Sequence, residues 1–195
     1  MATRERLNLA GKVALWGAES GIIVTLVGVV PALFLGTYVM EDIAAVALLI
    51  AYGLLFGHYL ARRLVSEGVA AAGHTRLLRG APAVAMVAGY LGMRLLMGLS
   101  EAIALSAVDG LVFGGLAGLI LGLAIQQLPL AVPGDTSLPR TVLVPAAFFI
   151  AGAVMGVTAG SALSIPLGWT VAIPLWQMGM GAVIGFLLAK SAAPA

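Results

Sequence analysis

The sequence predicts an all-α integral membrane protein built as a bundle of six transmembrane helices. Of its 195 residues, 62% are hydrophobic and only 9% are charged, against about 25% charged residues in ordinary globular domains. Six apolar segments are long enough to cross a hydrocarbon core of about 30 Å, which takes about 20 helical residues. In residues 109–123 glycine recurs every four residues, a pattern that destabilises a helix in water but suits close helix packing in lipid.

The six predicted spans lie at residues 13–36, 42–61, 81–104, 108–128, 141–164 and 169–189. The basic start of the chain resembles that of a signal peptide. The apolar stretch after it is too long for one and lacks a cleavage site with small residues, so we interpret it as a retained first span. The connections between the spans are too short to form a domain of their own. Residues 1–195 are therefore predicted to be a single transmembrane domain.

Lysine and arginine are distributed unevenly between the connections. The N-terminal flank, the second and fourth connections and the C-terminal tail carry them, whereas the first, third and fifth connections carry none. With an even number of spans, all the basic segments then lie on one side of the membrane. The positive-inside rule places that side, and both termini, in the cytoplasm. We expect the protein in a prokaryotic cytoplasmic (inner) membrane.

The second connection is the longest, and it carries Arg62, Arg63, Arg76 and Arg79. Apolar residues lie between these arginines. The Arg62–Arg79 loop therefore either lies in the interface and holds anionic lipid, at about 1 kcal/mol per basic residue, or is a solvated loop. Nucleic acid is not expected as a partner, because the net charge is only +2 and no basic cluster is interleaved with aromatic residues.

Glycine stripes on the last three spans predict where the helices pack most closely. On a helix this spacing places the positions without side chains on one face, so spans four to six are expected to approach until their backbones nearly touch. The alternative is a pore lined by bare backbone. The stripes are Gly110, Gly114, Gly118 and Gly122 in span four, Gly152, Gly156 and Gly160 in span five, and Gly181 and Gly185 in span six.

Polar side chains within the spans are the candidate functional residues. A charge at the centre of a span costs about 2.5–3.5 kcal/mol and therefore needs a partner or a role. Arg94, about thirteen residues into span three, is predicted near the middle of the membrane. In one interpretation the polar residues of the spans form a charge pathway. In the other they are independent of one another, and each is ion-paired, solvated or caps a helix. From outside to inside the pathway contains Asp109 and Glu101, then Arg94 and Gln177, then Glu19 and His58.

The sequence lacks the residues that several kinds of functional site require. The absence of cysteine excludes disulfides, thiolate metal sites and cysteine nucleophiles. Of the two histidines, His74 lies in a loop, so a haem held by two histidines is not supported, and the GxxxxGK[ST] and HExxH motifs are absent. We therefore predict no metal site and assign no cofactor.

The predicted function is a small transporter or channel for a proton, an ion or a small anionic solute that uses the intramembrane charges. The alternative is a non-catalytic membrane subunit of a larger complex, in which the bare glycine stripes dock a neighbouring helix; a homo-oligomer is also compatible. An enzyme is less favoured. A lipid-modifying site at Glu101 or Asp109 needs a second catalytic partner, and the sequence identifies none.

Overall fold

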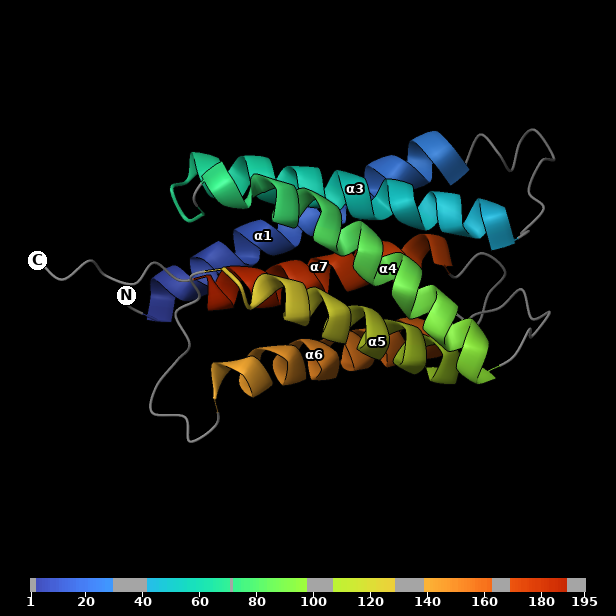
Figure 1. Ribbon diagram of the computed structural model, residues 1–195. Coiled ribbons are helices and arrows are strands. Elements are labelled where there is room, and N and C mark those ends of the chain that lie inside the picture. The colour runs from blue at the N-terminus through green and yellow to red at the C-terminus, as the bar shows by residue number, and fades with distance from the viewer. Residues whose placement is uncertain are drawn as a thin grey trace, which may run out of the picture.

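The computed structural model describes residues 3–29, 42–70, 72–97, 107–128, 139–162 and 169–188. Within these ranges it is all-helical, with six long helices and no strand (Figure 1). A π-helical turn, η1, continues the first helix, and a short 3-10 turn, η2, precedes the third. The elements are α1 (Thr3–Val24), η1 (Thr25–Val29), α3 (Asp42–Ser66), η2 (Ala72–His74), α4 (Thr75–Met97), α5 (Ala107–Ile125), α6 (Arg140–Ala162) and α7 (Trp169–Leu187).

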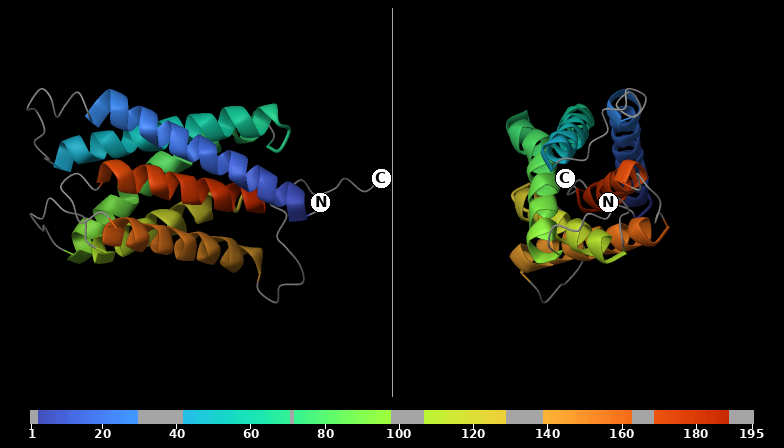
Figure 2. Two further views of the ribbon diagram at one scale, coloured as in Figure 1. Left: turned by 180° about the vertical axis from the view of Figure 1, so that it is seen from behind. Right: turned by 90° about the vertical axis from the view of Figure 1, so that its right-hand side faces the viewer.

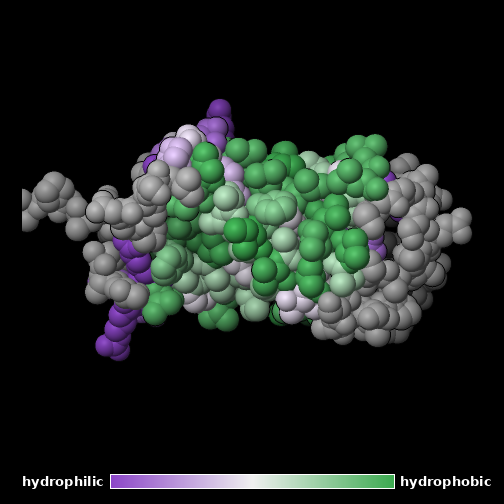
Figure 3. Space-filling model, turned by 90° about the horizontal axis from the view of Figure 1, so that it is seen from below, coloured by the Kyte–Doolittle hydropathy of each residue, from purple (hydrophilic) through white to green (hydrophobic). Residues whose placement is uncertain are grey.

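Four helices are long and apolar enough to cross a membrane: they contain Arg4–Gly28, Ala45–Ser66, Ala107–Ile125 and Arg140–Ala159. The prediction of an all-α chain is confirmed, and these four helices have the length and composition that membrane crossing requires. The apolar part of α7 is shorter, and α4 carries three arginines. Hydrophobic residues cover the middle of the face shown in Figure 3, and hydrophilic residues gather toward the end at which α1 begins.

Each predicted span overlaps one described helix, but some boundaries differ, and residues 30–36 and 98–104 of the predicted spans lie outside the described residues. The first helix begins at Thr3 instead of residue 13, and α4 begins at Thr75 instead of residue 81. The difference has a physical cause: hydropathy marks the part of a helix that lies in lipid, whereas arginine, lysine, glutamate and leucine are good helix formers in water as well. The helices therefore continue beyond the apolar stretches.

The six helices form a closed ring in chain order, in which α1 also contacts α7 (Figure 2). The contact of α5 with α6 is the most extensive, followed by those of α1 with α7 and of α3 with α4. Each of these pairs is antiparallel. The start of α1 and the end of α7 lie at the same end of the bundle (Figure 1). The fold thus consists of three close helix pairs, one of which joins the first helix to the last.

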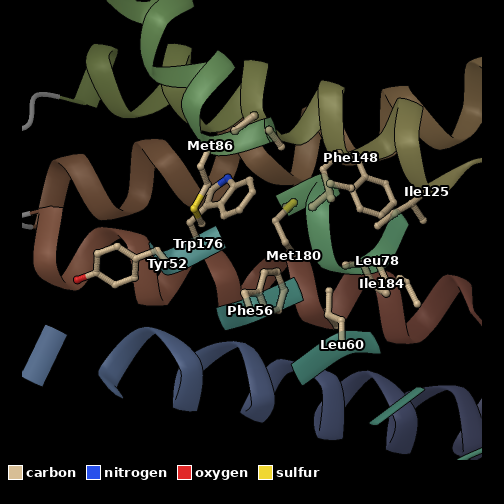
Figure 4. Close-up of a cluster of buried hydrophobic side chains, with 14 of the residues drawn as sticks. Tyr52, Phe56, Leu60, Leu78, Met86, Ile125, Phe148, Trp176, Met180 and Ile184 are labelled. Atoms are coloured by element: carbon tan, nitrogen blue, oxygen red, sulfur yellow. The ribbon is translucent and has the colours of Figure 1, made fainter. Parts of the chain in front are cut away.

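Large apolar side chains fill the centre of the ring (Figure 4). Trp176 is 1% exposed, its indole nitrogen donates a hydrogen bond to the carbonyl oxygen of Gly114 at 3.4 Å, and its ring centroid lies 6.2 Å from that of Phe113. Phe148 and Met180 belong to the same cluster and are fully buried. The axis of the bundle is therefore occupied by side chains, and any path through the protein has to follow an interface between helices.

The α5–α6 pair packs along glycine. A Cβ atom added at Gly110 would collide with the carbonyl oxygen of Gly156, and one added at Gly114 would collide with that of Gly152. No side chain fits at these positions without movement of the backbone, which is the arrangement that small residues allow in lipid. The same face of α5 continues through Gly118 and Gly122, which lie against Phe148 and Pro145, and Gly160 lies near the end of α6.

The glycines of α7 face a different neighbour from the one we expected. A Cβ atom at Gly181 would collide with the carbonyl oxygen of Val13, and one at Gly185 would lie within 3 Å of the backbone of Ala10. Both glycines therefore pack against α1, and the contact between α6 and α7 is far smaller. A glycine stripe shows which face of a helix is bare, but it carries no information about which helix covers that face.

An arginine joins the end of α5 to the start of α6. The side chain of Arg140 is half-buried, and its Nη2 donates hydrogen bonds to the carbonyl oxygen of Gln126 at 2.7 Å and to that of Leu128. These carbonyl groups follow the last turn of α5, where a helix leaves acceptors unpaired and favours positive charge. Arg140 thus holds the two ends of the α5–α6 hairpin together.

Candidate functional site

A row of polar contacts, which we call the α1–α3 seam, runs along the interface between α1 and α3. The two helices are antiparallel, so each contact further along α1 meets an earlier residue of α3. The row starts with an exposed ion pair and ends at a hydrogen bond to Tyr52, which is only 1% exposed. In order, the contacts join Lys12 Nζ to Glu67 Oε1 (3.2 Å), the Trp16 ring to Arg63 Cζ (5.9 Å), Glu19 Oε1 to the Tyr59 hydroxyl (3.3 Å) and Thr25 Oγ1 to the Tyr52 hydroxyl (2.7 Å).

The inner end of the seam meets α7 at a buried amide. Among the described residues, the polar side chains with no exposed area are those of Ser20 and Gln177. Gln177 Nε2 donates to the carbonyl oxygen of Tyr52 at 2.8 Å, and Ser20 Oγ lies within hydrogen-bond distance of Gln177 Oε1 at 3.4 Å and of the Gly17 carbonyl oxygen at 2.9 Å. A Cβ atom at Gly21 would lie 2.7 Å from Gln177 Oε1, so that glycine makes room for the amide. We call Ser20, Gly21, Tyr52 and Gln177 the amide cluster.

The hydrogen-bonding pattern of α1 changes directly after the amide cluster. Thr25–Val29 form the π-helical turn η1, and the hydroxyl of Thr25 donates to the carbonyl oxygen of Gly21 at 3.1 Å. Single π-helical turns are rare and frequently lie at functional sites. The irregular turn of α1 therefore begins at the residue that contacts Tyr52, where the seam reaches the core.

A hollow on the surface of α3 lies beside the seam. Its volume is about 280 Å³, and it is lined by Leu55, His58, Tyr59, Arg62 and Arg63. These positions are spaced by three and four residues and so lie on one face of the helix. His58 and both arginines are exposed, whereas Leu55 and Tyr59 are half-buried. The hollow, which we call the α3 hollow, therefore combines two guanidinium groups, an imidazole and a phenol with one apolar side chain.

The structure brings three of the predicted pathway residues close to the seam. Glu19 accepts the hydroxyl of Tyr59, His58 lines the α3 hollow, and Gln177 is the centre of the amide cluster. Glu101 lies outside the described residues. These placements connect residues that are far apart in the sequence, since α1, α3 and α7 each contribute one of the three.

Arg94 lies close to the C-terminal end of the described part of α4. It is in the last turn of the described α4, and its guanidinium carbon lies 5.9 Å from the ring centroid of Tyr90, within reach of a cation–π contact. Arg94 therefore lies toward the end of the bundle opposite the α3 hollow. Its position in the middle of a membrane, which rests on a span that starts at residue 81, stays a prediction.

Asp109 is half-buried in the first turn of α5. The helices α4 and α5 are antiparallel, and a Cβ atom at Gly89 would contact the backbone of Phe113 and Ala117. The same antiparallel register, continued from Gly89 toward the end of α4, places Arg94 and Asp109 at the same level of the α4–α5 interface. A basic and an acidic side chain thus share the end of the bundle remote from the N-terminus.

The sequence analysis missed the roles of Ser20, Thr25 and Tyr52. A partial signal was present, since Glu19, Ser20 and Thr25 are the polar residues of the first apolar stretch. Their spacing does not identify a partner, however, because a hydroxyl in a span also bonds to its own helix backbone. Tyr52 resembles any aromatic residue of a core until the position of α7 is known.

The α1–α3 seam joins side chains that can donate and accept protons. Carboxyl, phenol, hydroxyl and amide groups follow one another along the seam. In the part of the chain that the structure describes, no group of three or more histidine, aspartate or glutamate residues is placed to hold a metal ion. Comparisons of the chain with known protein families, with curated protein sequences and with solved structures found no match.

Proposed function

We propose that the protein spans a prokaryotic cytoplasmic membrane six times, with both termini inside, and transports a proton, an ion or a small anionic solute. The observation that carries this proposal is the α1–α3 seam, which leads from the basic end of the bundle to the fully buried Gln177. Polar groups in an apolar interior are costly, and within membrane spans they mark ion and substrate pathways.

In this proposal Glu19 is the residue at which the proton or ion enters the seam, and the amide cluster is the buried polar site that it reaches. Glu19 and Thr25 are six residues apart, or about 9 Å along the helix, a gap that water bridges when the seam opens. The contact of α1 with α3 is small compared with that of α5 with α6. The seam is therefore the interface expected to open and close, with the π-helical turn as its pivot.

The opposite end of the proposed pathway is formed by Arg94 and Asp109. We propose that the two side chains pair in one state of the protein, and that protonation of Asp109 or capture of an anion by Arg94 releases the pair. Such a change biases one arrangement of the helices over another, as a ligand with different affinities for two states does. The glycine-packed α5–α6 pair serves as a fixed glycine zipper against which the other helices move.

The experiment is a flux assay on purified protein in liposomes under an imposed pH gradient, with internal pH followed by a trapped dye. Wild type is expected to dissipate the gradient, and Glu19→Gln and Arg94→Gln are expected to abolish dissipation while the protein remains folded. Glu67→Gln is the matched control, because it also removes one carboxylate of the seam, but from an exposed ion pair at its outer end. If wild type shows no flux, proton transport is refuted; if Glu19→Gln and Arg94→Gln carry normal flux, the pathway is wrong.

A non-catalytic subunit of a membrane complex is the second candidate, and the filled axis of the ring favours it. Trp176, Phe148 and Met180 occupy the position in which a channel would need space. Purification from native membranes separates the two functions. A subunit is recovered with stoichiometric partner proteins, whereas a transporter is recovered alone or as a homo-oligomer.

A further inference from the structure

The α3 hollow contains positive charge that the surrounding protein does not neutralise. Among the described residues, neither Arg62 nor Arg63 forms an ion pair with a carboxylate. Of the acidic groups nearby, Glu67 pairs with Lys12, whereas Glu19 accepts the hydroxyl of Tyr59 and offsets only one of the two positive charges. Two guanidinium groups therefore face an open space, as is typical of a site for an anion with several oxygen atoms.

One of these guanidinium groups is held in position. The guanidinium carbon of Arg63 lies 5.9 Å from the ring centroid of Trp16, on the neighbouring helix. A cation–π contact of this kind leaves N–H groups of the guanidinium free to donate hydrogen bonds, and it favours the conformations in which the contact is made. The α3 hollow is thus partly organised before a ligand arrives.

The α3 hollow lies where polar and apolar surfaces meet. Its arginines are within the last turns of α3, next to the basic connection, and Trp16 and Tyr59 supply aromatic rings of the kind enriched at membrane interfaces. Toward the interior, the surface beside it carries Leu54, which is 48% exposed. A ligand that fits this setting has an anionic group at one end and a hydrocarbon chain at the other.

We propose that the α3 hollow binds the phosphate of an anionic phospholipid of the cytoplasmic leaflet. Arg62 and Arg63 contact the phosphate oxygens, Tyr59 borders the headgroup, and the acyl chain lies over Leu55 and Leu54. Basic pockets between transmembrane helices on the cytoplasmic side bind such headgroups. The proposal rests on the orientation in the membrane given above, and it is independent of whether the protein transports a solute.

The test measures binding of phosphatidylglycerol to purified protein in detergent by native mass spectrometry, with phosphatidylcholine and inorganic phosphate as the other probes. Wild type is expected to retain phosphatidylglycerol in preference to phosphatidylcholine. The double variant Arg62→Gln/Arg63→Gln is expected to bind it about thirtyfold more weakly. The matched control Arg76→Gln/Arg79→Gln removes the same charge from the same end of the bundle, outside the hollow, and is expected to change binding less than about threefold.

Each alternative outcome overturns the proposal. Equal loss in both double variants means that the lipid responds to net charge and not to the hollow. Competition by inorganic phosphate at millimolar concentration, lost in the Arg62→Gln/Arg63→Gln variant, means that the hollow takes a free anion instead of a lipid. If the double variant does not fold, the single variant Arg62→Gln replaces it, since Arg62 is exposed; unchanged binding in a folded Arg62→Gln protein is a negative result as well.

Discussion

The α1–α3 and α5–α6 interfaces are both antiparallel helix pairs, yet they differ in what separates the backbones. Between α5 and α6, no side chain separates the backbones at the glycines. The carbonyl oxygen of Gly156 occupies the space that a side chain at Gly110 would need. Between α1 and α3, polar side chains reach across from both helices, from Lys12 to Thr25. Backbone contact is stiff because it depends on many fixed atoms, whereas polar side chains exchange partners. One pair is therefore suited to hold the bundle and the other to move.

The largest effect is expected from a side chain placed in the α5–α6 interface. Gly114→Val puts a branched side chain where the carbonyl oxygen of Gly152 lies, and overpacking against backbone is expected to cost about 3 kcal/mol of stability. The measurement is chemical or thermal unfolding of the purified protein in detergent.

The matched control for this variant is a glycine in open space. A Cβ atom at Gly80, in α4, meets nothing within 4 Å. Gly80→Ala is expected to be neutral or to stabilise the protein by about 0.5–1 kcal/mol, because alanine is the better helix former. If Gly114→Val is tolerated as well as Gly80→Ala is, the two helices are not locked at this interface.

The next largest effect is expected from the amide cluster. Gln177→Leu removes the hydrogen bond to the Tyr52 carbonyl and the contact with Ser20, at an expected cost of about 2 kcal/mol in this buried setting. In the flux assay it is expected to abolish transport. Normal flux in a folded Gln177→Leu protein excludes the amide cluster from the pathway and leaves it a structural feature.

A smaller effect is expected at the connection of α5 to α6. Arg140→Gln removes donors to the carbonyl groups of Gln126 and Leu128 and the favourable charge at the end of α5. The free energy of unfolding is expected to fall by about 1.5 kcal/mol. This is the lower end of the range for hydrogen bonds to charged groups, because the side chain is only half-buried. Unfolding of this variant should be measured beside Arg140→Lys, which keeps the charge. Equal destabilisation of the two variants assigns the effect to hydrogen bonding and not to the helix dipole.

The smallest effect is expected at the outer end of the seam. Lys12→Gln removes an ion pair whose side chains are 53% and 34% exposed, and exposed pairs contribute about 0.2–1 kcal/mol, which salt reduces further. We expect a change below about 0.5 kcal/mol at physiological salt. A loss of several kcal/mol, measured by the same unfolding assay, contradicts the division of the molecule into a movable and a fixed pair.

Much of the helical architecture could be predicted from the sequence because lipid leaves the backbone few alternatives. A long apolar stretch has to satisfy its hydrogen bonds internally, so the segment that contains Gly110 and Gly114 is helical despite its poor propensity. The start of α1 at Thr3 was not predictable from hydropathy, since Arg4 and Arg6 extend the helix beyond the apolar stretch. That all six helices cross the membrane stays a prediction.

The candidate site was less predictable, because it depends on which helices become neighbours. Glu19, His58 and Gln177 were identified as costly or unusual residues, but their partners Tyr59 and Tyr52 were not. Periodicity defines a face of each helix, and contacts between faces depend on the closure of the whole ring. The depth predicted for Arg94 likewise depends on where its helix enters the membrane, and it stays a prediction.

The pairing of α1 with α7 has a consequence for the time course of synthesis. Gly17 and Gly21 of the first helix are covered by Gln177 and Pro174 of the last one. At about 5–20 residues per second, roughly ten to thirty seconds pass between the synthesis of α1 and that of its partner. During that interval the buried Ser20 has no access to Gln177. The newly made protein therefore remains an open set of helices until α7 is made, and a ribosome that stalls before α7 leaves the ring unclosed.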